Sequence, residues 1–254
     1  MAAVDGGDNP LYQQIAGDLR AAIREGVLPP GGKVPTEMDL SQRYSVSRNT
    51  ARMALTALAH EGLITAGRAR AGRLVRRREQ LVWTHRVSLS AVGRRLAGTD
   101  DFAEQTAAQG RVPDQTIEVG IVAAPGFVAE RLEVPAGESL VARRRLYLVD
   151  GAPSALAESY YALSFAQGTP LLDPRPYHRG TAALLAELGH KTVRTADEIT
   201  TRMPDPAEAL RLEIGHGVPV LAHVRISYAE RGPVRVATTI LPGDRHQLRY
   251  DLPG

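Results

Sequence analysis

The stretch SRNTAR at residues 47–52 combines side chains that are suited to hydrogen bonding with the edges of DNA bases. An arginine can pair with O6 and N7 of guanine, and an asparagine can pair with N6 and N7 of adenine. The hydroxyls of Ser47 and Thr50, together with the free N–H groups at the start of a helix, can hold a phosphate. This order of residues indicates contact with a nucleic acid.

Catalytic and metal-binding patterns are weak by comparison. The chain has no cysteine, and its seven histidines show neither HxxxH nor HExxH spacing. It also lacks GxSxG, a P-loop and a GxGxxG motif placed after a strand. We therefore expect no enzyme, no cofactor and no metal site. We interpret five of the histidines as solvated or structural: His178, His190, His216, His223 and His246.

Positive charge is concentrated in one part of the chain. Residues 40–80 hold nine arginines and two acidic residues, whereas residues 81–254 hold 19 basic and 20 acidic residues. A local basic block on a nearly neutral remainder is typical of a chain that meets a polyanion through one module.

Three short helices are predicted in the N-terminal part. Apolar residues recur every four positions in residues 11–23, which indicates an amphipathic helix that ends at Gly26. Thr36 begins a capping-box pattern, and Ser47 can cap a third helix that runs to about His60 and stops at Gly62. The third helix is therefore the element that must position the SRNTAR stretch.

Two short apolar segments, Leu63-Ile64 and Leu74-Val75, flank a tip rich in Gly and Arg. Together with the three helices, this pattern predicts a winged helix-turn-helix. The wing arginines Arg68, Arg70 and Arg73 are expected to reach the minor groove or the DNA backbone.

Residues 10–76 resemble the DNA-binding domain of GntR-family transcriptional regulators, through the pieces PTE–DL, YSVSRNTAR, AL–L and EGLI. There are two departures. Met38 stands where the family usually has an arginine, and the wing reads ARAGRLV instead of a QGRGTFV-like loop. The resemblance and the wing together imply these DNA-contacting residues: Thr36, Ser47, Arg48, Asn49, Thr50, Arg52, Arg68, Arg70, Gly72 and Arg73.

The rest of the chain mixes predicted strands with a few helices, which indicates an α+β domain around a mixed or antiparallel sheet. Asp150-Gly151 is a hairpin signal. Strands are expected at 115–123, 139–149, 153–161, 192–202, 218–228 and 234–241, and helices at 126–132, 180–188 and 205–212.

An internal repeat has a period of 80 residues. AERLEVPAGESLVARRRLYLVDGAP aligns without gaps on ALRLEIGHGVPVLAHVRISYAERGP. Two copies predict two halves related by a pseudo-twofold axis.

Residues 95–250 resemble the UTRA effector domain of the HutC branch of the GntR family, most clearly in RRRLYLVDGAPSALAESYY and GDRHQLRY. The resemblance implies a chorismate lyase-like fold that dimerises and binds a small effector. Arg235 stands where the sugar-phosphate branch often has Glu, so a sugar phosphate is not carried over and the identity of the effector stays open. The expected division is a disordered start (1–9), a winged helix-turn-helix (10–76), a linker (77–95) and a UTRA-like domain (96–252).

Alternation along a strand puts Arg143 and Arg145 on one face and Arg144 on the other. A two-residue turn at Asp150-Gly151 would set Arg143 directly across from Glu158, either as part of an effector pocket or as a cross-strand ion pair. The candidate effector-binding residues are Arg143, Arg145, Tyr147, Glu158, Tyr160 and Arg225.

The sequence therefore predicts a homodimeric transcriptional regulator that binds a short inverted repeat and responds to a small-molecule effector. Repression is the favoured mode of regulation. A ligand-independent plasmid-control or architectural DNA-binding protein and a lyase-like enzyme fused to a DNA-binding domain are the alternatives. No secretory signal or membrane span is visible, so a cytoplasmic protein is expected.

Overall fold

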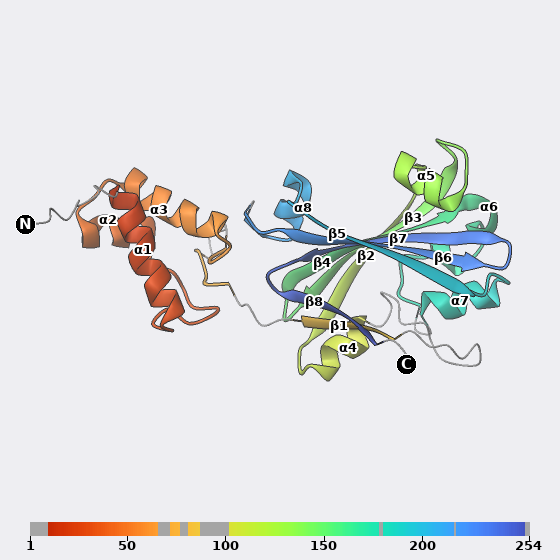
Figure 1. The fold of residues 1–254 in the computed structure, drawn as a ribbon, viewed down its shortest axis with the longest axis horizontal. Coiled ribbons are helices and arrows are strands. Elements are labelled where there is room, and N and C mark those ends of the chain that lie inside the picture. The colour runs from red at the N-terminus through yellow and green to blue at the C-terminus, as the bar shows by residue number, and fades with distance from the viewer. Residues whose placement is uncertain are drawn as a thin grey trace, which may run out of the picture. The chain divides into compact units, whose positions relative to one another are not determined.

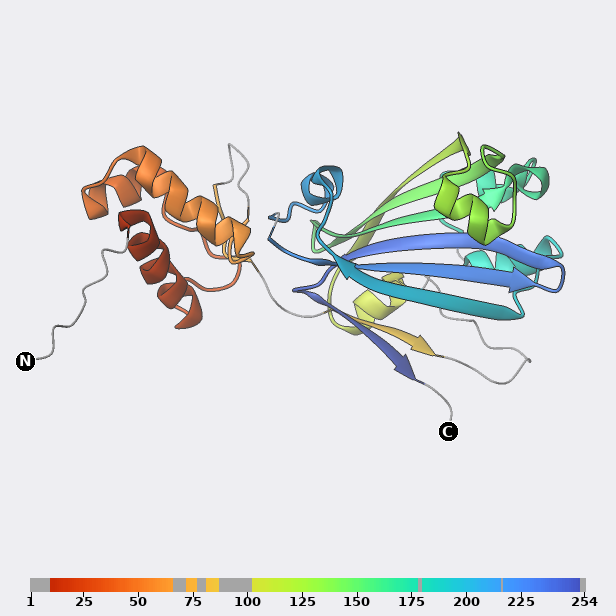
Figure 2. The same cartoon turned by 45° about the horizontal axis from the view of Figure 1, so that its top comes forward.

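A computed structural model of the chain describes residues 10–65, 72–76, 81–86, 102–177, 180–215 and 217–251. The chain divides into two compact units (Figures 1 and 2). One comprises Met1–Glu79 and Met203–Val218, and the other comprises Gln80–Arg202 and Pro219–Gly254.

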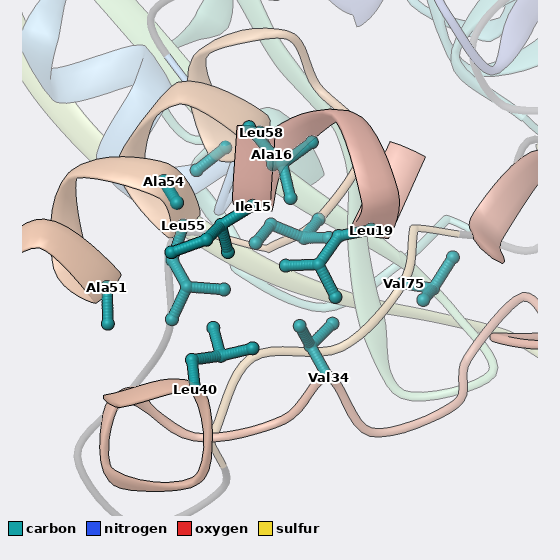
Figure 3. Close-up of a cluster of buried hydrophobic side chains, with 12 residues drawn as sticks. Ile15, Ala16, Leu19, Val34, Leu40, Ala51, Ala54, Leu55, Leu58 and Val75 are labelled. Carbon is teal, nitrogen blue, oxygen red and sulfur yellow. The ribbon is translucent and has the colours of Figure 1, made fainter. Parts of the chain in front are cut away.

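Three helices form the N-terminal part, as predicted: α1 (Leu11–Arg24), α2 (Glu37–Tyr44) and α3 (Arg48–His60). Each helix turns an apolar face inward, which buries a shared hydrophobic core (Figure 3). Ile15 and Leu19 come from α1, Leu40 from α2 and Leu55 from α3. This core fixes which face of α3 is left exposed.

The wing begins where the sequence predicts it. Ile64 pairs with Val75 in an antiparallel bridge, and Lys33 pairs with Leu74 in a second one. Gly72 has a φ of +72°, in the left-handed region that favours glycine. The N-terminal part is therefore a winged helix-turn-helix. The wing tip, including Arg68 and Arg70, lies outside the described residues.

The second unit is built on an antiparallel six-stranded sheet in the order β2-β3-β4-β7-β6-β5. Asp150 and Gly151 form the predicted turn between β3 and β4, both with positive φ. The strands are β2 (Pro113–Ala123), β3 (Ser139–Val149), β4 (Ala152–Ala162), β5 (Arg194–Arg202), β6 (Val220–Ala229) and β7 (Gly232–Pro242).

The internal repeat is confirmed by the topology. Adding 80 to the residue numbers of β2, β3 and β4 gives β5, β6 and β7 within one residue, and the strand order is symmetric about the β4·β7 pair. The same shift relates α5 (Gly126–Leu132) to α8 (Pro206–Arg211). It also relates two register shifts, one at Tyr147/Leu148 and one at Ser227/Tyr228. The two halves therefore share even their irregularities.

The two faces of the sheet are covered differently (Figure 1). Helix α5 packs on one face, against Leu140, Ala142 and Val236. The opposite face is covered by several elements: β1 (Leu81–Arg86), α4 (Phe102–Ala108), α6 (Leu163–Ala166), the short 3-10 helix η2 (Pro170–Leu172) and α7 (Thr181–Glu187).

One segment expected in a linker is part of the fold. Residues 81–86 form β1, which pairs in parallel with β8 (His246–Asp251). Leu81 and Trp83 of β1 are buried against Tyr147 and Phe102, and this burial explains why the segment is held as a strand. The helix α4 and the strand β8 are also absent from the predicted elements.

No helix in the described part of the chain is long and apolar enough to cross a membrane.

Candidate nucleic-acid interface and effector face

The start of α3 is fixed by a side-chain cap. Ser47 is extended, and its Oγ accepts a hydrogen bond from the backbone N–H of Thr50 at 3.1 Å. The Ser47 and Thr50 hydroxyls lie 2.9 Å apart. A polar N-cap satisfies one of the free N–H groups of the first turn, so the helix begins at Arg48. The residues predicted to hold a phosphate therefore lie together at the helix start.

The exposed face of α3 carries the predicted base-reading side chains. Ala51, Ala54 and Leu55 are buried in the core, which leaves Arg48, Asn49 and Arg52 in solvent. Arg52 Nη2 donates a hydrogen bond to Asn49 Oδ1 at 2.6 Å. This contact holds the guanidinium and the amide side by side on the exposed face of α3.

Thr36 begins α2 with the predicted capping box. Its hydroxyl accepts from Asp39 N at 3.2 Å and donates to Asp39 Oδ2 at 2.7 Å. These hydrogen bonds from Thr36 hold the pKa of the Asp39 carboxyl below its ordinary value. Met38, in the first turn of α2, is exposed. The Thr36 side chain therefore serves the cap in this structure.

Arg73 differs from the predicted wing contact. Its Nη1 donates to the backbone carbonyl of Leu55, in the middle of α3, at 3.0 Å. Burial lowers the pKa of its guanidinium. The long side chain folds back on α3, so Arg73 joins the base of the wing to the helix that presents Arg48 and Arg52.

Alternation on β3 places the three consecutive arginines as predicted. Arg143 and Arg145 are nearly fully buried, on the face that β1 and α4 also cover, together with Tyr147. Arg144 points to the other face and is 37% exposed.

The predicted pairing of Arg143 with Glu158 is wrong. Arg144 stands opposite Glu158, and its Nε lies 3.1 Å from Glu158 Oε1. The register shift between Tyr147 and Leu148 moves by one residue every pair that lies farther from the turn, from Tyr147 back to the start of β3. The Tyr160 hydroxyl donates to Glu158, and burial followed by this contact raises the pKa of Tyr160. Glu158 and Tyr160 therefore lie on the opposite face from Arg143 and Arg145, and the candidates split into two groups.

Arg143 binds the backbone of a neighbouring segment. Its guanidinium donates to the carbonyls of Leu171 at 2.8 Å and Arg175 at 3.1 Å, and to that of Asp173. These contacts join β3 to the chain that follows α6.

We expect Arg143→Ala to lower the free energy of unfolding by about 2–3 kcal/mol, because it removes charged hydrogen bonds from partly buried carbonyls. Arg144→Ala, which removes a side chain that is 37% exposed on the other face, is the matched control and is expected to change the free energy of unfolding by less than about 1 kcal/mol. Urea unfolding curves measure both. Equal losses for the two variants would contradict the assigned role of Arg143.

Two further buried groups, which the sequence pattern does not place, lie beside these arginines. Arg235 of β7 donates from Nη2 to the hydroxyl of Ser159 on β4 at 2.9 Å, and both side chains are buried. Ser159 pairs with Arg143 across β3 and β4. Only the strand order, with β7 beside β4, brings Arg235 here, and the sequence pattern does not give that order. Arg143, Arg145, Ser159 and Arg235 form what we call the cationic face.

Arg225, also a predicted effector ligand, forms a partly buried ion pair. Its guanidinium contacts Asp197 of β5 at 2.6 and 2.7 Å, and His223 Nε2 lies 3.0 Å from the same carboxyl. Burial opposes ionisation of Asp197, but the hydrogen bonds from Arg225 and His223 outweigh it and hold the pKa well below its usual range. Burial and the neighbouring Asp197 raise the pKa of Tyr250 to about 12.

No group of three or more His, Cys, Asp or Glu side chains that could hold a metal ion is found among the described residues.

A winged helix with an exposed polar helix start, joined to a six-stranded sheet domain, defines a two-domain DNA-binding regulator. Comparison with known proteins gives the family. Residues 11–73 match the gntR family of bacterial regulatory proteins, and residues 108–247 match the UTRA domain. The chain belongs to the GntR family and carries the UTRA domain expected of its HutC branch.

Individual relatives agree over nearly the whole chain. An uncharacterised HTH-type transcriptional regulator of Rhizobium meliloti is 30% identical, with 95% of this chain and 94% of that protein covered. The histidine utilization repressor of Pseudomonas putida is 26% identical, with 98% and 94% covered. A crystal structure of a GntR-family transcriptional regulator has a TM-score of 0.58 at 27% identity, with 97% and 99% covered.

Proposed function

We propose that this protein is a homodimeric transcriptional repressor that binds a short inverted repeat. The observation that carries the proposal is the exposed start of α3, where Arg48, Asn49 and Arg52 project from a helix capped by Ser47. Their residue types suit guanine and adenine edges, and a twofold protein requires a site with twofold symmetry. The name of the Pseudomonas putida relative supports repression over activation.

We further propose that a small effector binds the second domain at the cationic face and lowers operator affinity. Arginines buried inside a domain are uncommon, and a guanidinium fork is suited to bidentate binding of an anionic group. Arg145 and Arg235 are the arginines that we assign to effector binding, because both are buried on this face. Arg143 is assigned a structural role, because it donates to three backbone carbonyls. Arg225 is excluded from the proposal because Asp197 occupies its guanidinium.

The direct test is selection of a binding site from a random duplex pool with the full-length chain. We expect one enriched inverted repeat, bound by two protomers, and release of that DNA by a compound found in a thermal-shift screen. Enrichment of no sequence, with tight binding to all duplexes, would favour an architectural protein instead. Turnover of a compound bound at the cationic face would favour an enzyme.

Arg145→Ala is expected to leave operator binding unchanged and to abolish release by the effector. Allosteric coupling of about 1–3 kcal/mol corresponds to a fivefold to 150-fold loss of affinity on release, and this loss is what the variant should lack. Fluorescence anisotropy on labelled operator, with and without the compound, measures it. Arg144→Ala, the neighbour on the opposite face, should respond like the wild type. A normal response of Arg145→Ala would make Arg145 a structural residue.

A further inference from the structure

The exposed face of α3 carries one large apolar side chain among its polar ones. Met53 is 45% exposed, whereas Ala54 and Leu55, which follow it, are buried in the core. All residues of α3 are described, and no other large apolar side chain on this helix is exposed. Met53 is therefore on the same exposed face as the polar side chains of α3.

Met53 is continuous with the polar set on the same face. It lies four residues after Asn49, one turn along the helix, and Asn49 Nδ2 donates to its sulfur at 3.9 Å. The Oδ1 atom of the same Asn49 amide accepts a hydrogen bond from Arg52. Asn49 is therefore flanked by Arg52 and Met53, and the thioether lies beside the amide.

We propose that Met53 determines specificity by contacting the 5-methyl group of a thymine at or beside the base pair read by Asn49. This inference rests on the proposed DNA binding and adds a residue to it. Thymine is the base that presents an apolar group in the major groove, and apolar side chains recognise it there. Methionine is flexible and polarisable, which suits contact with a single methyl group.

Deoxyuridine tests the contact directly, because it lacks the methyl group and keeps the hydrogen-bonding edge of thymine. The full-length chain is used to select an operator, and each thymine of one half-site is then replaced in turn by deoxyuridine. We expect one replacement to weaken wild-type binding about fourfold, the effect of withdrawing one methyl group from apolar contact. Met53→Ala should bind the thymine and deoxyuridine forms of that site equally.

Met203→Ala is the matched control, since Met203 is also an exposed methionine, at 53%, but is not on α3. It should keep the wild-type pattern of deoxyuridine penalties. A half-site without thymine, a wild type indifferent to every replacement, or an unchanged penalty in Met53→Ala would each overturn the assignment. Failure of the proposed function gives a different result, because no operator is then selected at all. In that case the role of Met53 is also refuted.

Discussion

Arg52→Ala is expected to weaken binding to the selected operator by between about 30-fold and about 25,000-fold. A bidentate contact between a side chain and a base contributes about 1–3 kcal/mol, and a dimer on an inverted repeat makes the contact twice. Arg52 also holds Asn49 through the hydrogen bond to its Oδ1. The variant therefore loses one base contact and the fixed orientation of a second. Fluorescence anisotropy on operator DNA measures the change, and circular dichroism checks that the fold is retained.

Two further variants separate the causes of that loss. Arg24→Ala removes an exposed arginine from the last turn of α1, away from α3, and should bind the operator within about threefold of the wild type. Arg52→Lys keeps the charge but lacks the planar fork. It should keep the salt dependence of binding to random DNA while losing most of the preference for the operator. Wild-type affinity in Arg52→Ala would remove α3 from the role of reading bases.

The DNA-binding part was the more predictable half of the chain, because its signals are local. Capping by Thr36 and Ser47 depends on residues three positions away, and amphipathic spacing depends on residues three or four apart. Both sets of contacts form within one helix. The destination of Arg73 was not predictable in this way, since its partner at Leu55 is 18 residues distant and is reached only after the wing folds onto α3.

The sheet domain shows the same division between local and distant contacts. Strands β3 and β4 and their turn follow from alternation and from Asp150-Gly151. The register shift beside Tyr147 does not follow from these signals, because the alternation of β3 does not reveal an extra residue in β4 opposite it. That single shift exchanged Arg143 for Arg144 as the partner of Glu158 and divided the predicted pocket between two faces.

The strand β1 was missed for a different reason. Its partner β8 lies at the other end of the domain, and the intervening sequence gives no indication that the two pair. Trp83 is the signal that could have found it, because a large aromatic residue directly after two apolar residues, Leu81 and Val82, seldom belongs to an exposed linker.

Asp197→Asn is expected to lower the free energy of unfolding of the sheet domain by about 3 kcal/mol at neutral pH. The side chains of Asp197 and Arg225 are only 16% and 12% exposed, so the variant leaves a buried guanidinium without its counter-charge. Glu158→Gln is the matched control, because it breaks the ion pair with Arg144, whose side chains are 30% and 37% exposed. It should change stability by less than about 1 kcal/mol. Urea unfolding measures both variants.

The pH dependence distinguishes the charge of Asp197 from its shape. The pKa of Asp197 is depressed in the folded state, so its contribution is fully present above the unfolded value of about 3.9 and is lost as pH falls toward the folded pKa. The gap in unfolding free energy between wild type and Asp197→Asn should therefore narrow as pH falls from about 4 toward 2. A gap that stays constant over the whole range would mean that the introduced amide disturbs packing, and that the ion pair with Arg225 contributes little to the domain.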